Sequence, residues 1–276
     1  MTDHSPLVES SDDIWKELRT ATQARIGLGR TGNALPTVRV LDLKTAHSSA
    51  RDAVHIPLDA AEFASTIENA GIGTPQFVQS EAQNRSVYLR RPDLGRTPSS
   101  LSHLTADHSD LGFVLADGLS PRGLLSHGAG LLHALIAELS TSYTIAPPVI
   151  ATQARVAIGD HIGAALGVRT VVVIIGERPG LSVADSLGIY LTHLPGPGCT
   201  DADRNCISNI HPPDGQSYIR AARTVETLLA GALKLGRSGV ELKDETGMDL
   251  AGTETLTIAR PSSQEEPYEL NGSTND

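Results

Sequence analysis

The chain of 276 residues is long enough for one large domain or two modest ones, and its 39% hydrophobic and 20% charged residues are typical of a globular protein. No apolar run approaches the roughly 18–20 residues that a membrane-spanning helix needs. The N-terminus also lacks the basic and then apolar pattern of a secretory signal. These features predict a cytoplasmic protein with no membrane partner.

The formal net charge of −10 is unevenly distributed, because residues 244–276 contain eight acidic residues and one basic residue, Arg260. The rest of the chain is close to neutral and has no basic stripe that would follow a phosphate backbone. Aromatic residues make up only 3% of the chain, so stacking platforms for single-stranded nucleic acid are scarce. We therefore expect no nucleic-acid partner.

The first 105 residues are predicted to form a helical N-terminal region. One amphipathic helix begins at Ser11 or Asp12, and a second begins at Thr37. The second helix carries a stripe at helical spacing, formed by Val40, Leu43, His47, Ala50 and Val54. Residues 86–89 favour a short strand, which a proline-containing turn follows.

From residue 111, short apolar runs alternate with amphipathic helices. Strands are predicted at 112–116, 149–151, 170–175 and 189–192, and helices at 122–139, 160–167 and 218–235. This alternation is typical of a parallel sheet with helices on its faces. The continuous apolar run at 171–175 is typical of a central strand that is buried on both sides.

The predicted fold is therefore α/β, with a helical N-terminal region followed by a Rossmann-like parallel sheet with flanking helices. We divide the chain into the helical region at 1–105, the α/β domain at 106–243 and an acidic tail at 244–276. The tail is rich in Thr, Ser, Glu, Gly and Pro and has little apolar periodicity, so it is predicted to be disordered.

One glycine motif matches the sequence pattern of a dinucleotide-binding fingerprint, but its flanking segments do not. Residues 27–32 read GLGRTG, which fits G-x-G-x-x-G. That motif needs a buried strand before it and a helix directly after it, so that the helix N-terminus meets the pyrophosphate. An amphipathic helix precedes the motif and NALPT follows it. The context favours a glycine-rich connection over a nucleotide site.

Two polar segments follow predicted strands, at the sheet edge where ligands of α/β proteins bind. Residues 117–120, DGLS, either contribute to a site or cap the next helix through Asp117 or Ser120. Residues 176–180, GERPG, place Glu177 just after the most apolar strand. Its carboxylate either accepts hydrogen bonds from a ligand or forms an ion pair with a nearby arginine such as Arg178.

The two cysteines, Cys199 and Cys206, fit neither a disulfide framework nor the usual spacing of a zinc site. As a nucleophile, Cys206 would need a base, and the sequence offers His193 and His211 nearby in the chain. The alternative is a small, partly buried side chain without chemistry. The residues alone favour this second interpretation.

Five ordered segments resemble a known family, the small subunit of ethanolamine ammonia-lyase. They are DGLS (117–120), RVAIGDHIG (155–163), GERPGL (176–181), DSLGIYLT (185–192) and RNCISNI (204–210). The N-terminal half is also similar, through ARIGLGRTG (24–32), AHSSARDAV (46–54) and YLRRPDLGR (88–96). The resemblance covers roughly residues 14–240, and GERPGL together with RNCISNI is its most specific part.

The resemblance implies a two-subunit enzyme that converts ethanolamine to acetaldehyde and ammonia with adenosylcobalamin, by adenosyl-radical chemistry. In this family a large subunit, a TIM barrel, holds the substrate, and the cobalamin lies between the two chains. The partner implied is therefore that large subunit, in a hetero-oligomer, and this chain alone is expected to be inactive. Three cobalamin-contacting positions of the family fall on Val156, Glu177 and Cys206.

Some members of the family carry an N-terminal extension that targets a bacterial microcompartment. The segment MTDHSPLVES, which precedes the first predicted helix, is not amphipathic and does not support that route. Two other functions stay open at this point. They are a cobalamin-binding scaffold subunit that does not support turnover, and a lone Rossmann oxidoreductase based on GLGRTG.

Overall fold

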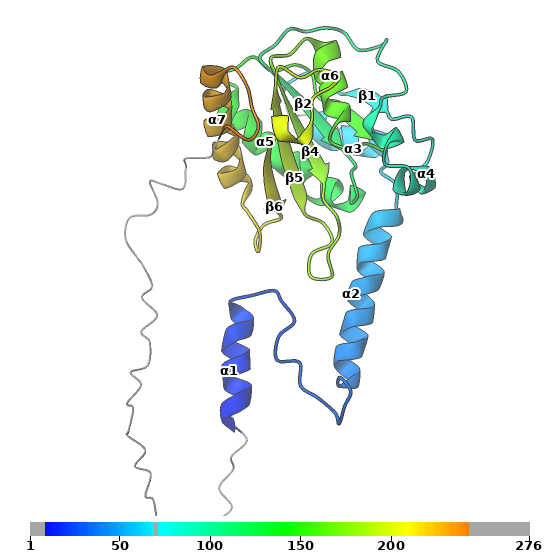
Figure 1. Ribbon diagram of the computed structural model, residues 1–276, viewed down its shortest axis with the longest axis vertical. Coiled ribbons are helices and arrows are strands. Elements are labelled where there is room, and N and C mark those ends of the chain that lie inside the picture. Colours follow the sequence, from blue (N-terminus) through cyan, green and yellow to red (C-terminus); the bar gives the residue numbers. More distant parts are fainter. Residues whose placement is uncertain (1–8, 69–70, 243–276) are drawn as a thin grey trace, which may run out of the picture. The chain divides into compact units, whose positions relative to one another are not determined.

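The computed structural model describes residues 9–68 and 71–242, which belong to one compact unit. They form an α/β fold, as predicted (Figure 1). The helices are α1 (Glu9–Thr20), α2 (Thr37–His55), α3 (Ala60–Ile67), α4 (Arg85–Arg90), α5 (Pro121–Leu139), α6 (Ile158–Leu166) and α7 (Tyr218–Leu235), with short 3₁₀ turns at Leu94–Arg96 and Asp201–Asp203. The strands are β1 (Gln76–Gln79), β2 (Leu111–Ala116), β3 (Val149–Thr152), β4 (Thr170–Gly176), β5 (Leu187–His193) and β6 (Asn205–Ile210).

The six strands form one sheet in the order β1-β3-β2-β4-β5-β6. The first four strands in this order are parallel, as the alternation of strands and helices predicts. β5 then runs antiparallel to β4, and β6 antiparallel to β5. The carboxyl ends of β2, β3 and β4 therefore meet at one edge of the sheet, and β6 ends at that same edge.

The central strand β4 divides the hydrophobic core into two parts. Val172 and Ile174 pack in the cluster that α3, α5 and α7 cover. Val171, Val173 and Ile175 point to the opposite face, where α6 covers them. All seven residues of β4 are buried, which confirms the prediction of a central strand covered on both sides.

Helix ends follow the capping rules at several places. Ser120 caps α5 by accepting from Gly123 N at 3.1 Å, so the capping interpretation of DGLS is confirmed for Ser120. Gly167, with φ of 67°, ends α6, and Gly236, with φ of 74°, ends α7. The helix predicted at 160–167 begins earlier, at Ile158, so Asp160 lies in the first turn of α6, where it pairs with Arg204.

Several local predictions were wrong. Residues 86–89 lie in α4, because the Asn84 side chain caps this turn by accepting from Val87 N at 3.0 Å. β1 and β6 were missed, since β1 has four residues and β6 is largely polar. The stripe of α2 is half-buried or exposed: Ala53 is the one fully buried residue of that helix, and His47 is exposed.

The division of the chain at residues 105 and 106 stays a prediction, although β1 brings part of the first segment into the sheet. The acidic tail at 244–276 lies outside the residues that the structure describes. Within the described residues, no helix is both long and apolar enough to cross a membrane.

Two loops approach each other closely at the carboxyl edge of the sheet. Gly118 follows β2 with φ of +56°, and a Cβ added there would overlap the carbonyl oxygen of Gly176 at the end of β4. Leu119 N donates to that same oxygen at 3.0 Å. The close approach and the left-handed backbone both require glycine at position 118.

Asp117 fixes the same edge from inside the protein. Its side chain is fully buried and accepts from Gln153 N at 2.8 Å and from Ala154 N at 2.9 Å, just past β3. Its other partner is the guanidinium of Arg85, 3.5 Å away and almost as buried. Burial raises the pKa of Asp117 to about 6, and the two N–H donors and Arg85 oppose that rise.

Replacing Gly118 with alanine tests the contact between the two loops. Gly118→Ala should lower the free energy of unfolding by at least about 2 kcal/mol, because the added methyl group meets backbone and the φ is left-handed. Urea unfolding followed by circular dichroism measures this. Gly196→Ala is the matched control, since its Cβ would meet nothing within 4 Å, and its effect should stay within about 0.5 kcal/mol. Equal effects at the two positions would contradict the account.

Replacing Asp117 tests the buried ion pair. Asp117→Asn leaves the Arg85 charge without a counter-charge and should cost about 3 kcal/mol of unfolding free energy. The double variant Asp117→Asn/Arg85→Met should lose less than the sum of the two single variants, and additive losses would show that the pair is not coupled. The folded state holds the Asp117 proton more tightly than the ordinary pKa of 3.8 implies. The wild type should therefore lose stability as the pH rises from about 4 to about 6, and the Asn variant should lack that part of the slope.

Candidate functional site

A cavity of about 440 Å³ lies at the carboxyl ends of β2, β3 and β4. It contains two of the three residues that the sequence predicts for cofactor binding, Val156 and Glu177. Its lining is formed by Tyr88, Gly118, Leu119, Arg155, Val156, Ile175, Gly176, Glu177, Arg178 and Tyr190. The site is thus at the edge where ligands of open α/β sheets bind.

Val156 lies in the turn that joins β3 to α6. The turn is held by Arg155 N, which donates to Gly95 O at 2.7 Å, and by Gly159 N, which donates to Val156 O at 3.0 Å. The Val156 side chain is half-buried and packs against the apolar cluster on the α6 face of the sheet. It therefore gives the cavity an apolar wall.

Glu177 follows β4 directly and is held by its own backbone N–H, which donates to Ser186 O at 3.0 Å. Both carboxylate oxygens lie 3.3 Å from Asn209 N, on β6. No arginine among the described residues forms a salt bridge with Glu177, so the ion-pair interpretation of the sequence is wrong. The carboxylate keeps acceptor capacity for a further donor, because it has more lone pairs than this one N–H group can use.

Cys206 does not line the cavity, but its neighbour across the strands does. In the register of β5 and β6, Cys206 is opposite Tyr190, whose ring lines the cavity. Partial burial raises the pKa of the Cys206 thiol, and a hydrogen bond with Tyr190 opposes that rise. Burial likewise raises the pKa of the Tyr190 phenol. Both groups are therefore neutral near pH 7, although the Cys206 residue is exposed.

A nucleophilic role for Cys206 has no support in this geometry. His193 Nδ1 is hydrogen-bonded to Thr170 Oγ1 at 2.8 Å, and His211 Nε2 to Asn209 Oδ1 at 2.8 Å. Each imidazole is thus engaged with a partner other than the thiol. A thiol with a raised pKa is also a weak nucleophile.

Sequence reasoning missed the aromatic centre of the site. Tyr88, on α4, is fully buried and donates from its hydroxyl group to Ala154 O at 3.1 Å. The guanidinium groups of Arg85 and Arg155 lie over its ring, at 4.7 and 4.5 Å from the centroid. The predicted strand at residues 86–89 hid this arrangement, because it placed Tyr88 in the wrong kind of element.

The dinucleotide fingerprint is not formed. Residues 27–32 lie in the connection between α1 and α2, so a helix precedes them where the motif needs a strand. Gly27, Gly29 and Gly32 all have positive φ, as a glycine-rich connection allows. The oxidoreductase alternative therefore loses the feature on which it rested.

A larger hollow, of about 590 Å³, lies between residues 23–25, α2 and the loops at 180–185 and 211–214. It is lined by charged and polar side chains, including Arg25, Arg122 and Asp185. None of the three predicted site residues lines it. The smaller cavity is the better candidate, because it combines the sheet edge with Val156 and Glu177.

The smaller cavity has apolar and polar groups that suit a ligand, but it lacks a pair of groups for acid–base catalysis. Among the described residues that line it, Glu177 is the one carboxylate and there is no histidine. Its walls combine apolar surface with acceptors and two guanidinium groups.

Comparisons with known proteins show which family this chain resembles. An ethanolamine ammonia-lyase small subunit from Rhodococcus erythropolis is 60% identical over 257 residues, which cover 93% of this chain and 98% of the relative. The small subunit from Xanthomonas campestris pv. campestris is 45% identical over 258 residues, 90% of this chain and 94% of the relative. That from Azotobacter vinelandii is 44% identical over 254 residues, 89% and 92% of the two chains.

The family model for the ethanolamine ammonia-lyase light chain matches residues 12–243. The match includes the whole sheet, the carboxyl-edge cavity and Cys206. The chain therefore belongs to the ethanolamine ammonia-lyase small subunit family.

Proposed function

We propose that this chain is the cofactor-covering subunit of an adenosylcobalamin-dependent ethanolamine ammonia-lyase, which converts ethanolamine to acetaldehyde and ammonia. The large subunit, a TIM barrel in this proposal, carries the substrate, and the cobalamin lies between the two chains. The observation that carries the proposal is the cavity at the carboxyl edge, which brings Val156 and Glu177 together in a chain of this family.

The residues present suit a corrin. Val156 offers an apolar contact to the edge of the ring. Glu177 offers a carboxylate to the N–H donors of the amide arms, and a hydrogen bond to a charged acceptor is stronger than one between neutral groups. Cys206, beside Tyr190, adds a neutral and polarisable surface next to the cavity.

Each residue of this chain has a binding role in the proposal. When bound, adenosylcobalamin supplies the adenosyl radical that abstracts a hydrogen atom from the substrate. Val156 and Tyr190 keep water from one side of the cavity, and Glu177 orients an amide arm. The backbone contacts of Gly118 and Gly176 hold the loops in place before the ligand arrives, which lowers the entropy lost on binding.

The first test of the proposal is the dependence of activity on the partner. Ammonia release from ethanolamine should appear only when this chain, a large subunit and adenosylcobalamin are combined, because this chain has a binding surface and no acid–base site. A coupled assay for acetaldehyde, run with each component omitted in turn, measures this. Turnover by this chain alone would contradict the proposal. A large subunit that is fully active without this chain would contradict it equally.

The second test concerns Glu177. Glu177→Gln keeps the shape of the side chain, but removes its charge and brings an amide donor against the donors of the corrin arms. Cobalamin binding to the reconstituted complex should weaken about tenfold to a hundredfold, because one charge-assisted hydrogen bond is worth roughly 1.5–3 kcal/mol. Titration with adenosylcobalamin, with assembly checked by size-exclusion chromatography, gives the affinity.

Glu62→Gln is the matched control for this variant, since Glu62 is exposed on α3 and lines no part of the cavity. It should leave cobalamin affinity unchanged. Equal affinity of the Glu177→Gln complex and the wild type would remove Glu177 from the site. A complex that no longer assembles would make Glu177 a residue of the subunit interface.

A further inference from the structure

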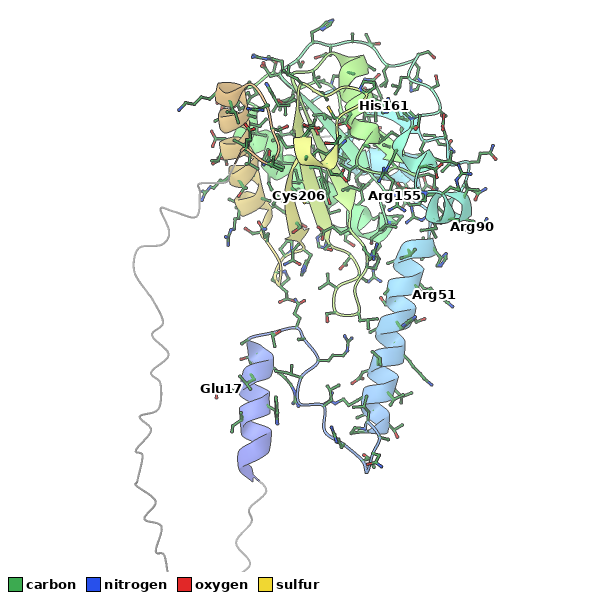
Figure 2. The ribbon with its side chains drawn as sticks, in the orientation of Figure 1. Glu17, Arg51, Arg90, Arg155, His161 and Cys206 are labelled. Atoms are coloured by element: carbon green, nitrogen blue, oxygen red, sulfur yellow. The ribbon has the colours of Figure 1, made fainter. Side chains whose placement is uncertain are left out.

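Arg155, labelled in Figure 2, directly precedes Val156. Its side chain lines the cavity. Its position is fixed from three sides. The backbone N–H donates to Gly95 O at 2.7 Å, and the guanidinium lies over Tyr88, 4.5 Å from the ring centroid. The turn at Gly95 packs against the aliphatic part of the Arg155 side chain. A Cβ added at Gly95 would lie 2.9 Å from Arg155 Cγ. The guanidinium is therefore held in place by contacts within the chain itself.

Arg85 and Arg155 lie over the same tyrosine, but only Arg85 has acceptors and a counter-charge among the described residues, although its buried Nη2 has no partner there. Arg85 donates to Gly118 O at 2.8 Å and to Val54 O at 2.6 Å, and it faces Asp117 at 3.5 Å. For Arg155, no acceptor for the guanidinium and no salt bridge is found in the part of the chain that the structure describes, and its buried Nε has no partner there. A half-buried cation without a counter-charge is costly unless a ligand supplies one.

The other charges of the cavity do not compensate for Arg155. The described lining contains two arginines, Arg155 and Arg178, and one carboxylate, Glu177, which leaves an excess of one positive charge. Glu177 already accepts from Asn209 N. Asp117 is occupied by two backbone N–H groups and by Arg85. The cavity thus combines acceptors for amide donors with one fixed guanidinium that has no counter-charge among the described residues.

We propose that Arg155 binds the phosphodiester of the nucleotide arm of cobalamin, which is the anionic group among the otherwise neutral arms of that ligand. This inference rests on the proposed cobalamin function. A planar guanidinium matches two phosphate oxygens with two parallel N–H donors, and the Tyr88 ring beneath it fixes its plane. Arg155 is accordingly a residue that selects complete cobalamins over corrinoids that lack the nucleotide arm.

The test compares two corrinoids on the complex of this chain with its large subunit. Cyanocobalamin carries the phosphodiester, and dicyanocobinamide has the same corrin without it. Arg155→Gln should lower the affinity for cyanocobalamin about tenfold to a hundredfold, as expected for the loss of a charge-assisted contact. The affinity for dicyanocobinamide should change less than about threefold. The readout is the visible absorbance of corrinoid retained by the complex in equilibrium ultrafiltration, which requires no turnover.

Arg90→Gln is the control, because Arg90 is an exposed arginine on α4 that lines no part of the cavity. It should change the affinity for either corrinoid only slightly. An Arg155→Gln effect that is equal for both corrinoids, or absent for both, would overturn the assignment. A selective loss of cyanocobalamin affinity in Arg178→Gln, the variant of the other arginine in the cavity, and not in Arg155→Gln would overturn it as well. A wild-type complex that binds neither corrinoid would instead contradict the proposed function itself.

A second measurement covers an Arg155→Gln variant that does not assemble. For the wild-type complex, raising the ionic strength should lower the affinity for cyanocobalamin more than the affinity for dicyanocobinamide, because salt screens the contact between guanidinium and phosphate. An equal dependence on salt for the two corrinoids would overturn the assignment.

Discussion

The site depends on the close contact between the loops that follow β2 and β4. Gly118 and Gly176 bring the two backbones together, and Asp117 ties the same edge to the residues after β3 through Gln153 N and Ala154 N. One buried carboxylate therefore joins the ends of β2 and β3, and its counter-charge, Arg85, is held from α4. These contacts within the chain hold the segments that carry Val156 and Glu177 at the cavity.

The antiparallel strands β5 and β6 extend this edge beyond the parallel sheet. Their register puts Cys206 opposite Tyr190, and Asn209 lies within reach of Glu177. Arg204 pairs with Asp160 of α6, so the beginning of β6 is attached to the helix that follows Val156. Segments that are far apart in the chain thus form one surface.

The sequence predicts the parallel core well, because apolar runs such as residues 171–175 carry a strong pattern. It predicts Val156, Glu177 and Cys206 through resemblance, and the structure places the first two in one cavity. It cannot predict the position of Tyr88 between two arginines. The segment of α4 is too short for its residue pattern to separate a helix from a strand, and the helix start depends on the Asn84 cap. Nor can it separate the roles of Arg85 and Arg155, since only tertiary contacts show that Asp117 is the counter-charge of Arg85 and not of Arg155.

The most direct test of the account is a structure, by electron cryomicroscopy, of this chain with its large subunit and cyanocobalamin. The account predicts corrinoid density against the carboxyl-edge cavity, with Val156 at the ring, Glu177 at an amide arm and Arg155 at the nucleotide arm. Density that lies wholly within the large subunit, or against another face of this chain, would contradict it.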